Sequence, residues 1–189
     1  ECIHGGDGCS RLIEQMATII VGEEPFEIDR LYEKIRRRYL FNGGIAGNAV
    51  TALTGIEIAL QDLVGKALNV PVYQLLGGKF RDKIRLYCDC HAGNDDSPES
   101  YAVRAKEIVA MGFNAIKFDI DDAKSPHKLD TYNWSITPGE LHQMVDRVSA
   151  VREAIGPDVD LAIDMHGRYD MFAAIRVAQA MEPFNLMWL

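Results

Sequence analysis

The sequence predicts an α/β protein in which a helical segment precedes parallel strands that alternate with helices. Residues 1–83 repeat apolar side chains at helical spacing. From about residue 84, short apolar strands alternate with amphipathic helices in units of roughly 30 to 50 residues. Strands joined by a crossover helix run parallel, so we expect right-handed crossovers. The change of pattern near residue 84 also predicts a domain boundary between residues 1–83 and 84–189.

The first segment is expected to contain four helices. One begins at Ser10, its predicted cap, and runs to Val21, and a second begins near Asp29. A long helix follows the turn at residues 41–47, and its many small residues allow another backbone to approach closely. Pro71 opens a short helix that stops at a glycine pair.

The second segment is expected to alternate strands with capped helices. Strands are predicted at residues 84–90, 115–120, 160–165 and from 185. The helix caps are Ser97, Thr137 with Glu140 as a capping box, and Asp170. A closed barrel and an open doubly wound sheet both satisfy this order, and both collect polar residues at the carboxyl ends of their strands.

Composition excludes several classes of protein. The chain has 189 residues, 48% of them hydrophobic, and a net charge of −8, which argues against binding to nucleic acid or to an anionic membrane. No apolar run approaches the roughly 20 residues needed to cross a bilayer. Four cysteines without a Cys-x-x-Cys motif favour reduced thiols and a cytoplasmic location over disulfides or a zinc site.

Polar side chains follow three of the predicted strands. His91 follows the first, Lys117 and Asp119 share a face of the second, and Asp164 and His166 share a face of the third. Taken singly, each has a structural explanation as a cap, a loop residue or a solvated charge. Together, on successive strand ends, they predict one site, in which a carboxylate could contribute to binding a hard cation such as Mg²⁺.

The long loop at residues 121–136 carries aromatic and cationic side chains, Trp134 among them. Such a strand-to-helix loop is either a lid over a polar substrate or a solvent-exposed loop with no role in binding.

Residues 52–66 (ALTGIEIALQDLVGK) and 71–78 (PVYQLLGG) resemble the signature of the enolase superfamily, in its mandelate racemase/muconate lactonizing enzyme branch. Lys117-x-Asp119 falls where that branch carries its second-strand motif. Asp164-x-His166-Gly167-Arg168 resembles the third-strand motif of acid-sugar dehydratases such as galactonate and mannonate dehydratases. The resemblance covers nearly the whole chain in order and spacing.

The resemblance implies part of a (β/α)₈ barrel preceded by the helical part of an α+β capping domain. Residues 1–83 would be the helical portion of the cap, and residues 84–189 the first half of the barrel. The chain resembles an internal piece of such an enzyme, so the general base and two further metal carboxylates would lie outside it.

The resemblance also implies a reaction, namely Mg²⁺-dependent dehydration of a small sugar acid (an aldonate or aldarate) through an enolate. Asp164 would be a metal ligand, His166 the general acid, and Lys117 a catalytic positive charge near the substrate carboxylate. Asp119 stands where racemases and some dehydratases carry a second lysine, so it is expected to bind substrate hydroxyls. His91 and Arg168 would be secondary substrate contacts.

Two alternatives stay open. One is a racemase, epimerase or cycloisomerase of the same superfamily, against which the carboxylate at Asp119 counts. The other is a non-catalytic half-barrel that self-associates, because three parallel units leave a sheet edge exposed. A homo-oligomer is expected in either case.

Overall fold

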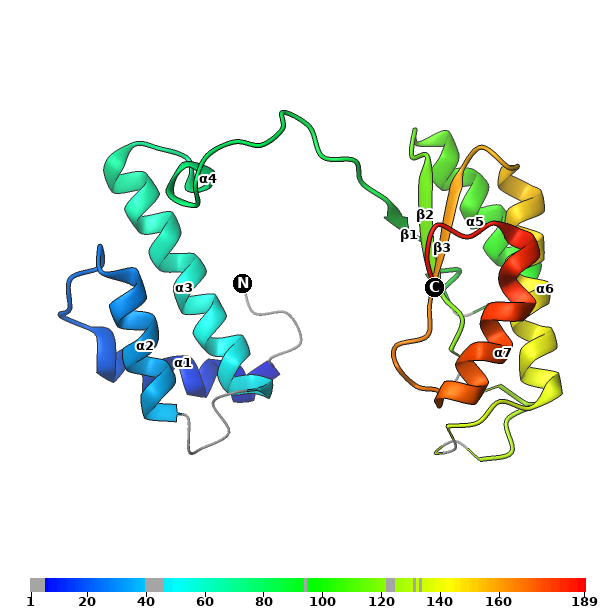
Figure 1. Ribbon diagram of the computed structural model, residues 1–189, viewed down its shortest axis with the longest axis horizontal. Helices are drawn as coiled ribbons and strands as arrows, with labels where there is room; N and C mark the ends of the chain where they lie inside the picture. The colour runs from blue at the N-terminus through cyan, green and yellow to red at the C-terminus, as the bar shows by residue number, and fades with distance from the viewer. Residues whose placement is uncertain (1–5, 40–45, 94, 122–124, 131, 133) are drawn as a thin grey trace. The chain divides into compact units, whose positions relative to one another are not determined.

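The computed structural model describes residues 6–39, 46–93, 95–121, 125–130, 132 and 134–189. The chain divides into two compact units, Glu1–Lys83 and Ile84–Leu189 (Figure 1). The first unit is helical where it is described, and the second contains the sheet.

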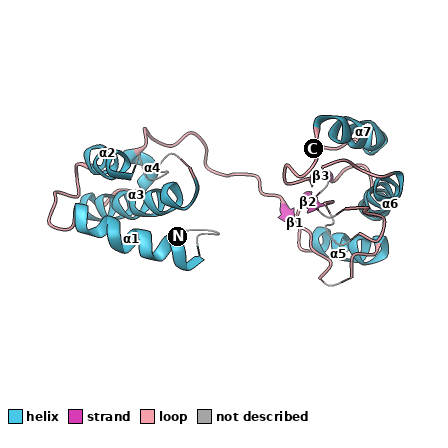
Figure 2. Ribbon diagram, turned by 90° about the horizontal axis from the view of Figure 1, so that it is seen from below, coloured by secondary structure: helices cyan, strands magenta, loops and turns pink. Residues whose placement is uncertain are grey.

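The first unit consists of helices around an apolar core (Figure 2). Its elements are α1 (Gly6–Ile20), α2 (Ile28–Tyr39), α3 (Gly47–Leu68) and the short α4 (Val72–Leu75). Met16 of α1, Ile35 of α2 and Ala52 of α3 are fully buried in one cluster. Ala49 and Ala52, two of the small residues of α3, therefore face the neighbouring helices, which allows close contact between the helices.

Two predicted helix starts differ from the structure. Helix α1 already begins at Gly6, so Ser10 lies inside the helix and the prediction that it is the cap was wrong. Asp7 occupies the first turn instead, where a negative charge favours the helix dipole. Helix α2 begins at Ile28, and Asp29 likewise lies in its first turn.

Helix α3 ends in a left-handed cap at Asn69, whose φ is 54°. The backbone N–H of Val70 then donates to the carbonyl of Gly65 at 2.9 Å. A Cβ atom at Gly65 would lie 3.0 Å from the carbonyl oxygen of Val70, so this close return of the chain favours glycine at that position.

The second unit is a parallel three-stranded sheet in the order β1-β2-β3 with helices against one face (Figures 1 and 2). In chain order its elements are β1 (Cys88–Asp89), α5 (Pro98–Ala110), β2 (Ala115–Asp119), α6 (Pro138–Ile155), β3 (Asp160–Asp164), α7 (Met171–Met181) and a 3₁₀ turn, η2 (Glu182–Phe184). The predicted α/β class with parallel strands is confirmed.

The three helix caps predicted in this unit are also confirmed. The Ser97 side chain accepts from the backbone of Ser100, and the Asp170 side chain accepts from the N–H of Ala173. Thr137 and Glu140 form the complete capping box. These local bonds fix where α5, α6 and α7 begin, and therefore how much chain is left for each loop between strand and helix.

The first strand is shorter than the predicted residues 84–90. Its register pairs Cys88 with Ile116 and Asp89 with Lys117, and β2 begins only at Ala115. Residues 84–86 would therefore pair with residues that precede the strand. A fourth strand begins to form beside β3, where Trp188 bridges Ala162 in parallel.

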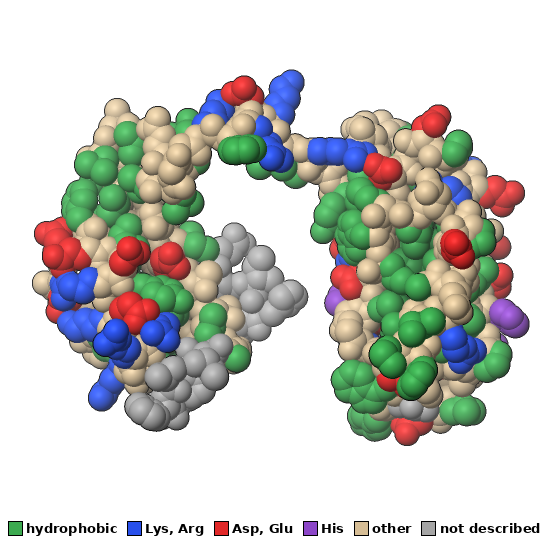
Figure 3. Space-filling model, viewed as in Figure 1, with side chains coloured by type: hydrophobic (Ala, Val, Ile, Leu, Met, Phe, Trp, Pro, Cys, Tyr) green, Lys and Arg blue, Asp and Glu red, His purple; other side chains and the backbone are tan. Residues whose placement is uncertain are grey.

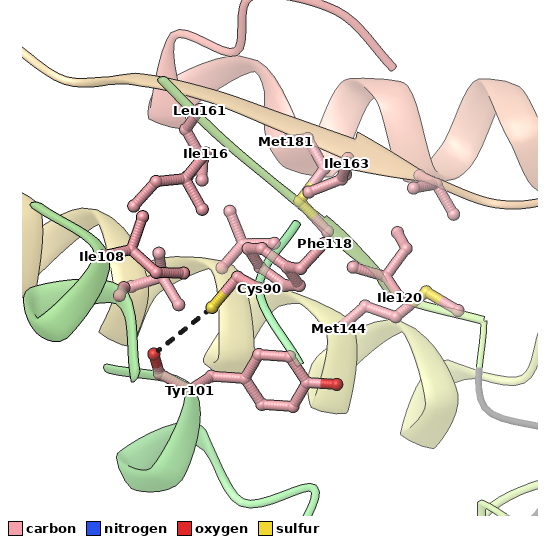
Figure 4. Packing of buried hydrophobic residues seen from close by; sticks show 14 of the residues in the cluster. Cys90, Tyr101, Ile108, Ile116, Phe118, Ile120, Met144, Leu161, Ile163 and Met181 are labelled. Carbon is pink, nitrogen blue, oxygen red and sulfur yellow. Dashed lines mark hydrogen bonds between the residues drawn. The ribbon is translucent and has the colours of Figure 1, made fainter. Parts of the chain in front are cut away.

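The hydrophobic core of the second unit lies between the sheet and its helices (Figure 4). Ile116 and Phe118 of β2 and Leu161 and Ile163 of β3 are fully buried there. Cys90 also points to this side, with its sulfur 4.0 Å from the carbonyl oxygen of Tyr101. The alternate residues of each strand must therefore face away from the helices.

Lys, Arg, Asp and Glu side chains interleave on the surface around α2 (Figure 3). Glu23 accepts from Arg30 at 2.7 Å and from Lys34 at 2.5 Å, and Glu33 pairs with Arg36 and Arg37. This face thus has no large area of a single charge sign. Within the described parts of the chain, every helix is too short or too polar to pass through a bilayer.

Candidate active site

Four polar side chains lie on the face of the sheet opposite the helices, at the carboxyl ends of the strands. The register places Asp89 beside Lys117 and Asp119 beside Asp164. Residues paired in parallel strands point to the same side of a sheet. Three strands therefore deliver three carboxylates and one ammonium group to a single rim.

Lys117 lies at the centre of this group. Its side chain is only 11% exposed, and its Nζ atom lies 2.5 Å from Asp119 Oδ1, 3.5 Å from Asp89 Oδ1 and 3.7 Å from Asp164 Oδ2. Burial by itself would lower the pKa of Lys117, but the hydrogen bond to Asp119 and the charges of all three carboxylates outweigh it and raise the pKa above its usual value. Lys117 is therefore a fixed positive charge.

Asp164 and His166 are joined through a tight turn. The backbone N–H of His166 donates to Asp164 Oδ1 at 2.8 Å, and this bond is the main reason that the pKa of Asp164 is lowered. The Nε2 atom of His166 lies 4.0 Å from Asp164 Oδ2 and 3.9 Å from Asp119 Oδ2. Both carboxylates thus lie close to the same ring nitrogen.

The backbone at this turn is unusual. His166 has a φ of 51° and Gly167 a φ of 62°, both in the left-handed region, which a residue with a side chain adopts only rarely. The N–H of Arg168 closes the turn by donating to the carbonyl of Met165 at 3.0 Å. This conformation brings the side chains of His166 and Arg168 to one side of the chain.

Asp121 completes the cluster, although the sequence analysis did not identify it. Its side chain is 4% exposed and lies 2.9 Å from His166 Nδ1 and 2.8 Å from Arg168 Nε. The hydrogen bond to Asp121, followed by the charges of the surrounding carboxylates, raises the pKa of His166. The alternation that selected Lys117 and Asp119 continues to Asp121 and could have indicated it.

Asp89 was missed for a different reason, because it stands between two cysteines in a run interpreted as a strand. It contacts Lys117 and also holds His91, whose Nε2 lies 2.8 Å from Asp89 Oδ2. The His91 side chain is 61% exposed and contacts the cluster at Asp89. The structure therefore brings Lys117 and Asp119 into the centre of the cluster and leaves His91 at its margin.

The side chains of the cluster can be compared with the ligands that metal ions prefer. Asp119, Asp164 and His166 each offer one ligand atom, and these atoms all lie within 4.8 Å of one another. Carboxylate oxygens suit Mg²⁺, whereas an imidazole nitrogen suits transition metals better. Since Mg²⁺ prefers oxygen ligands, Asp119 and Asp164 are the members of the group whose chemistry fits this ion.

Both units match sequence families. Residues 7–77 match the mandelate racemase/muconate lactonizing enzyme N-terminal domain, and residues 100–189 match the enolase C-terminal domain-like family. The C-terminal match spans β2 and β3, which carry most of the cluster.

Curated relatives share this similarity over nearly the whole chain. A D-xylonate dehydratase of Haloferax volcanii is 40% identical over 97% of this chain and 45% of its own length. A D-gluconate dehydratase of Thermoproteus tenax is 38% identical over 92% of this chain and 33% of its own length. The chain thus spans less than half the length of these two relatives.

Solved structures agree with the sequence comparisons. A mandelate racemase/muconate lactonizing enzyme-like protein from Rubrobacter xylanophilus superposes with a TM-score of 0.90 at 48% identity, over 96% of this chain and 50% of the other. On this evidence from sequence and fold, the chain belongs to the mandelate racemase/muconate lactonizing enzyme branch of the enolase superfamily.

Proposed function

We propose that the protein is a Mg²⁺-dependent acid-sugar dehydratase acting on an aldonate or aldarate. The cluster of Lys117, Asp164 and His166 carries this proposal, since Asp164 Oδ2 lies 3.7 Å from Lys117 Nζ and 4.0 Å from His166 Nε2. The names of the relatives, D-xylonate and D-gluconate dehydratase, support the same reaction class. The chain carries part of the active site in this proposal.

The proposed reaction removes the proton next to the substrate carboxylate and the hydroxyl group on the following carbon. That proton is weakly acidic, so the enolate formed on its removal needs positive charge nearby. The electron pair of the broken C–H bond becomes a C=C bond as the hydroxyl leaves with a proton, as water. The resulting enol then converts to a 2-oxo-3-deoxy acid.

Each central residue has a proposed role in this reaction. Asp164 is a ligand of Mg²⁺, which supplies Lewis-acid charge to the substrate when bound. Lys117 keeps its proton and places positive charge beside the substrate carboxylate or enolate. His166 donates the proton that leaves with the hydroxyl, a task for which an imidazole near neutral pH is suited.

The remaining residues are assigned to substrate binding. Asp119 accepts hydrogen bonds from sugar hydroxyls, and His91 and Arg168 make secondary contacts from the margin of the rim. A lysine whose pKa is raised is a poor base, which speaks against Lys117 in that role. We assign the general base to the portion of the relatives that this chain does not span.

We assign residues 1–83 to the helical portion of the capping domain and residues 84–189 to the first half of the barrel. The two family matches and the division of the chain into two units support this assignment. Large apolar side chains near the sheet edges, including Leu86 and Tyr87, are more than half exposed, which favours a homo-oligomer. The reduced thiols of Cys88 and Cys90 fit a cytoplasmic enzyme.

The test measures 2-oxo acid formation from D-xylonate, D-gluconate and D-galactonate by the whole protein with Mg²⁺. His166→Asn should lower the rate by about 10²- to 10⁴-fold while changing Mg²⁺ affinity little. Unchanged activity in that variant would refute the role of His166. Incorporation of deuterium from D₂O without loss of water would instead favour a racemase or epimerase.

The 189-residue chain by itself is expected to bind Mg²⁺ weakly and to show no turnover. Calorimetric titration with Mg²⁺, combined with sedimentation, tests this directly. Tight stoichiometric binding by an isolated monomer would contradict an incomplete site. Stable self-association of the 189-residue chain with no Mg²⁺ binding at all would instead favour the non-catalytic half-barrel.

A further inference from the structure

Asp121 lies at the carboxyl end of β2, one residue beyond Ile120, and is the most deeply buried carboxylate of the cluster. Its side chain is 4% exposed, whereas that of Asp164 is 37% exposed. One carboxylate oxygen faces His166 Nδ1 at 2.9 Å and the other faces Arg168 Nε at 2.8 Å. Both oxygens are therefore engaged by side chains from the turn after β3.

The sheet and the turn hold this arrangement together. The N–H of Ile120 donates to the carbonyl of Asp164 at 3.1 Å, which extends the pairing of β2 with β3 to Ile120, the residue before Asp121. On the other side, the left-handed backbone at His166 and Gly167 brings the His166 and Arg168 side chains back toward Asp121. The contact thus depends on backbone geometry as well as on charge.

The bond to Asp121 determines which ring nitrogen of His166 faces the rest of the cluster. An ionised carboxylate accepts hydrogen bonds and donates none, so His166 Nδ1 must carry the hydrogen. The opposite nitrogen, Nε2, then lies 3.9 Å from Asp119 Oδ2 and 4.0 Å from Asp164 Oδ2. Rotation of the ring by a half-turn would break the Asp121 bond.

We propose that Asp121 is a positioning residue that fixes the ring of His166 with Nε2 directed toward the substrate. Arg168 supports it by holding the second carboxylate oxygen, which prevents the carboxylate from rotating away. The proposal rests on the function assigned above, in which His166 delivers a proton. Asp121 itself touches no reacting atom and acts through His166 alone.

The first test determines which ring nitrogen of His166 carries the hydrogen, in the 189-residue chain without substrate. In ¹⁵N-labelled protein, at a pH where His166 is neutral, the ring nitrogen shifts should show hydrogen on Nδ1. Asp121→Leu should move the hydrogen to Nε2, and Asp121→Asn, which keeps an acceptor oxygen, should retain it on Nδ1. If Asp121→Leu unfolds the chain, Asp121→Ser, whose side chain is too short to reach the ring, replaces it.

Arg168→Met is the matched control, because it removes the other partner of Asp121 and leaves the bond to His166. Hydrogen should stay on Nδ1 in this variant. If Asp121→Leu or Asp121→Ser also keeps hydrogen on Nδ1 in a folded chain, the positioning role is wrong, whatever reaction the protein catalyses.

The second test uses kinetics of the whole protein. Asp121→Leu should lower kcat by about 10- to 100-fold with little change in KM, and Asp121→Asn should restore part of the loss. In a His166→Asn background the Asp121 substitution should cost nothing further. A wild-type protein without dehydratase activity would refute the proposed function, whereas an active protein with unchanged kcat in Asp121→Leu would refute this inference alone.

Discussion

The Nζ atom of Lys117 lies 2.5 Å from the nearer carboxylate oxygen of Asp119, two residues along the same strand. The contact explains how a nearly buried ammonium group is accommodated on a sheet face, since a buried charge is tolerated only when it is paired. It also shows that the carboxylate at position 119 has a partner within the protein, beyond any contact it makes to a substrate.

Replacing Lys117 by Met should destabilise the protein, because three carboxylates would then share the rim without a positive charge between them. We expect a loss of about 1 to 3 kcal/mol in the free energy of unfolding, measured by urea denaturation at neutral pH. Lys117→Arg, which keeps the charge, should lose less. Equal stability of Lys117→Met and the wild type would contradict the central place given to this ammonium group.

Mg²⁺ binding should be lost when the aspartate at the carboxyl end of β3 is replaced and kept when the aspartate at its amino end is replaced. Asp164→Asn removes a carboxylate at the carboxyl end and should abolish the weak binding expected of the 189-residue chain, on the order of millimolar. Asp160→Asn is the matched control, because Asp160 lies at the other end of the same strand and pairs with Arg85 at 2.6 Å. Calorimetry that shows the same loss in both variants would exclude a specific role for Asp164.

The pH dependence of stability should include a contribution from Glu140, which forms the α6 capping box and accepts from Lys128 at 2.9 Å. Burial would raise the pKa of Glu140, but the bonds from Thr137 and Lys128 outweigh it and lower the pKa below its usual value. A lowered pKa gives stability that is fully present above the unfolded value and is lost as the pH falls through the folded value.

Glu140→Gln tests this, because glutamine can keep the capping bond but carries no charge. Wild type should be more stable than the variant at pH 7, and the difference should shrink as the pH falls below about 4.5. Urea unfolding at a series of pH values measures it. A difference that grows toward acid would contradict the assigned direction. Thr137→Ala should cost about 1 kcal/mol at every pH through loss of the cap.

The cysteines should differ in reactivity. Burial raises the pKa of Cys90 to about 11, and its sulfur lies in the core, so alkylation of the folded protein near pH 8 should leave Cys90 unmodified. Cys88 is partly exposed and should react before Cys90. Peptide mapping after iodoacetamide treatment reads this out, with urea-unfolded protein as the control. Rapid labelling of Cys90 in the folded state would be evidence against this packing. Cys2 lies outside the described residues.

Local sequence signals were sufficient for much of the second unit. The caps at Ser97, Thr137 and Asp170 were correct because each depends on bonds within four residues. The cap at Ser10 was wrong because α1 extends a turn further back than the polar signal indicated. Strand 84–90 was overestimated, since strand length depends on a partner elsewhere in the chain.

In the cluster, too, local sequence patterns predicted some contacts, whereas others depend on residues far apart in the chain. Period-two alternation placed Lys117 with Asp119, because side chains two apart in a strand share a face. Asp164 and His166 do lie together, but through a tight turn after β3, where strand alternation no longer applies. The contact between Asp121 and His166 joins residues 45 positions apart. It depends on the register of β2 with β3 and on a left-handed backbone at His166, a conformation that histidine adopts more often than most residues but still only in a minority of cases.

The sequence by itself therefore determined the order of elements, the parallel class and the polar residues at the strand ends, all of which follow from short-range periodicity and capping. Only the tertiary structure decided that Asp89 and Asp121 join them, and which nitrogen of His166 faces the other carboxylates. Those relationships are set by strand register and burial, where side chains distant in sequence compete for the same few hydrogen-bond partners.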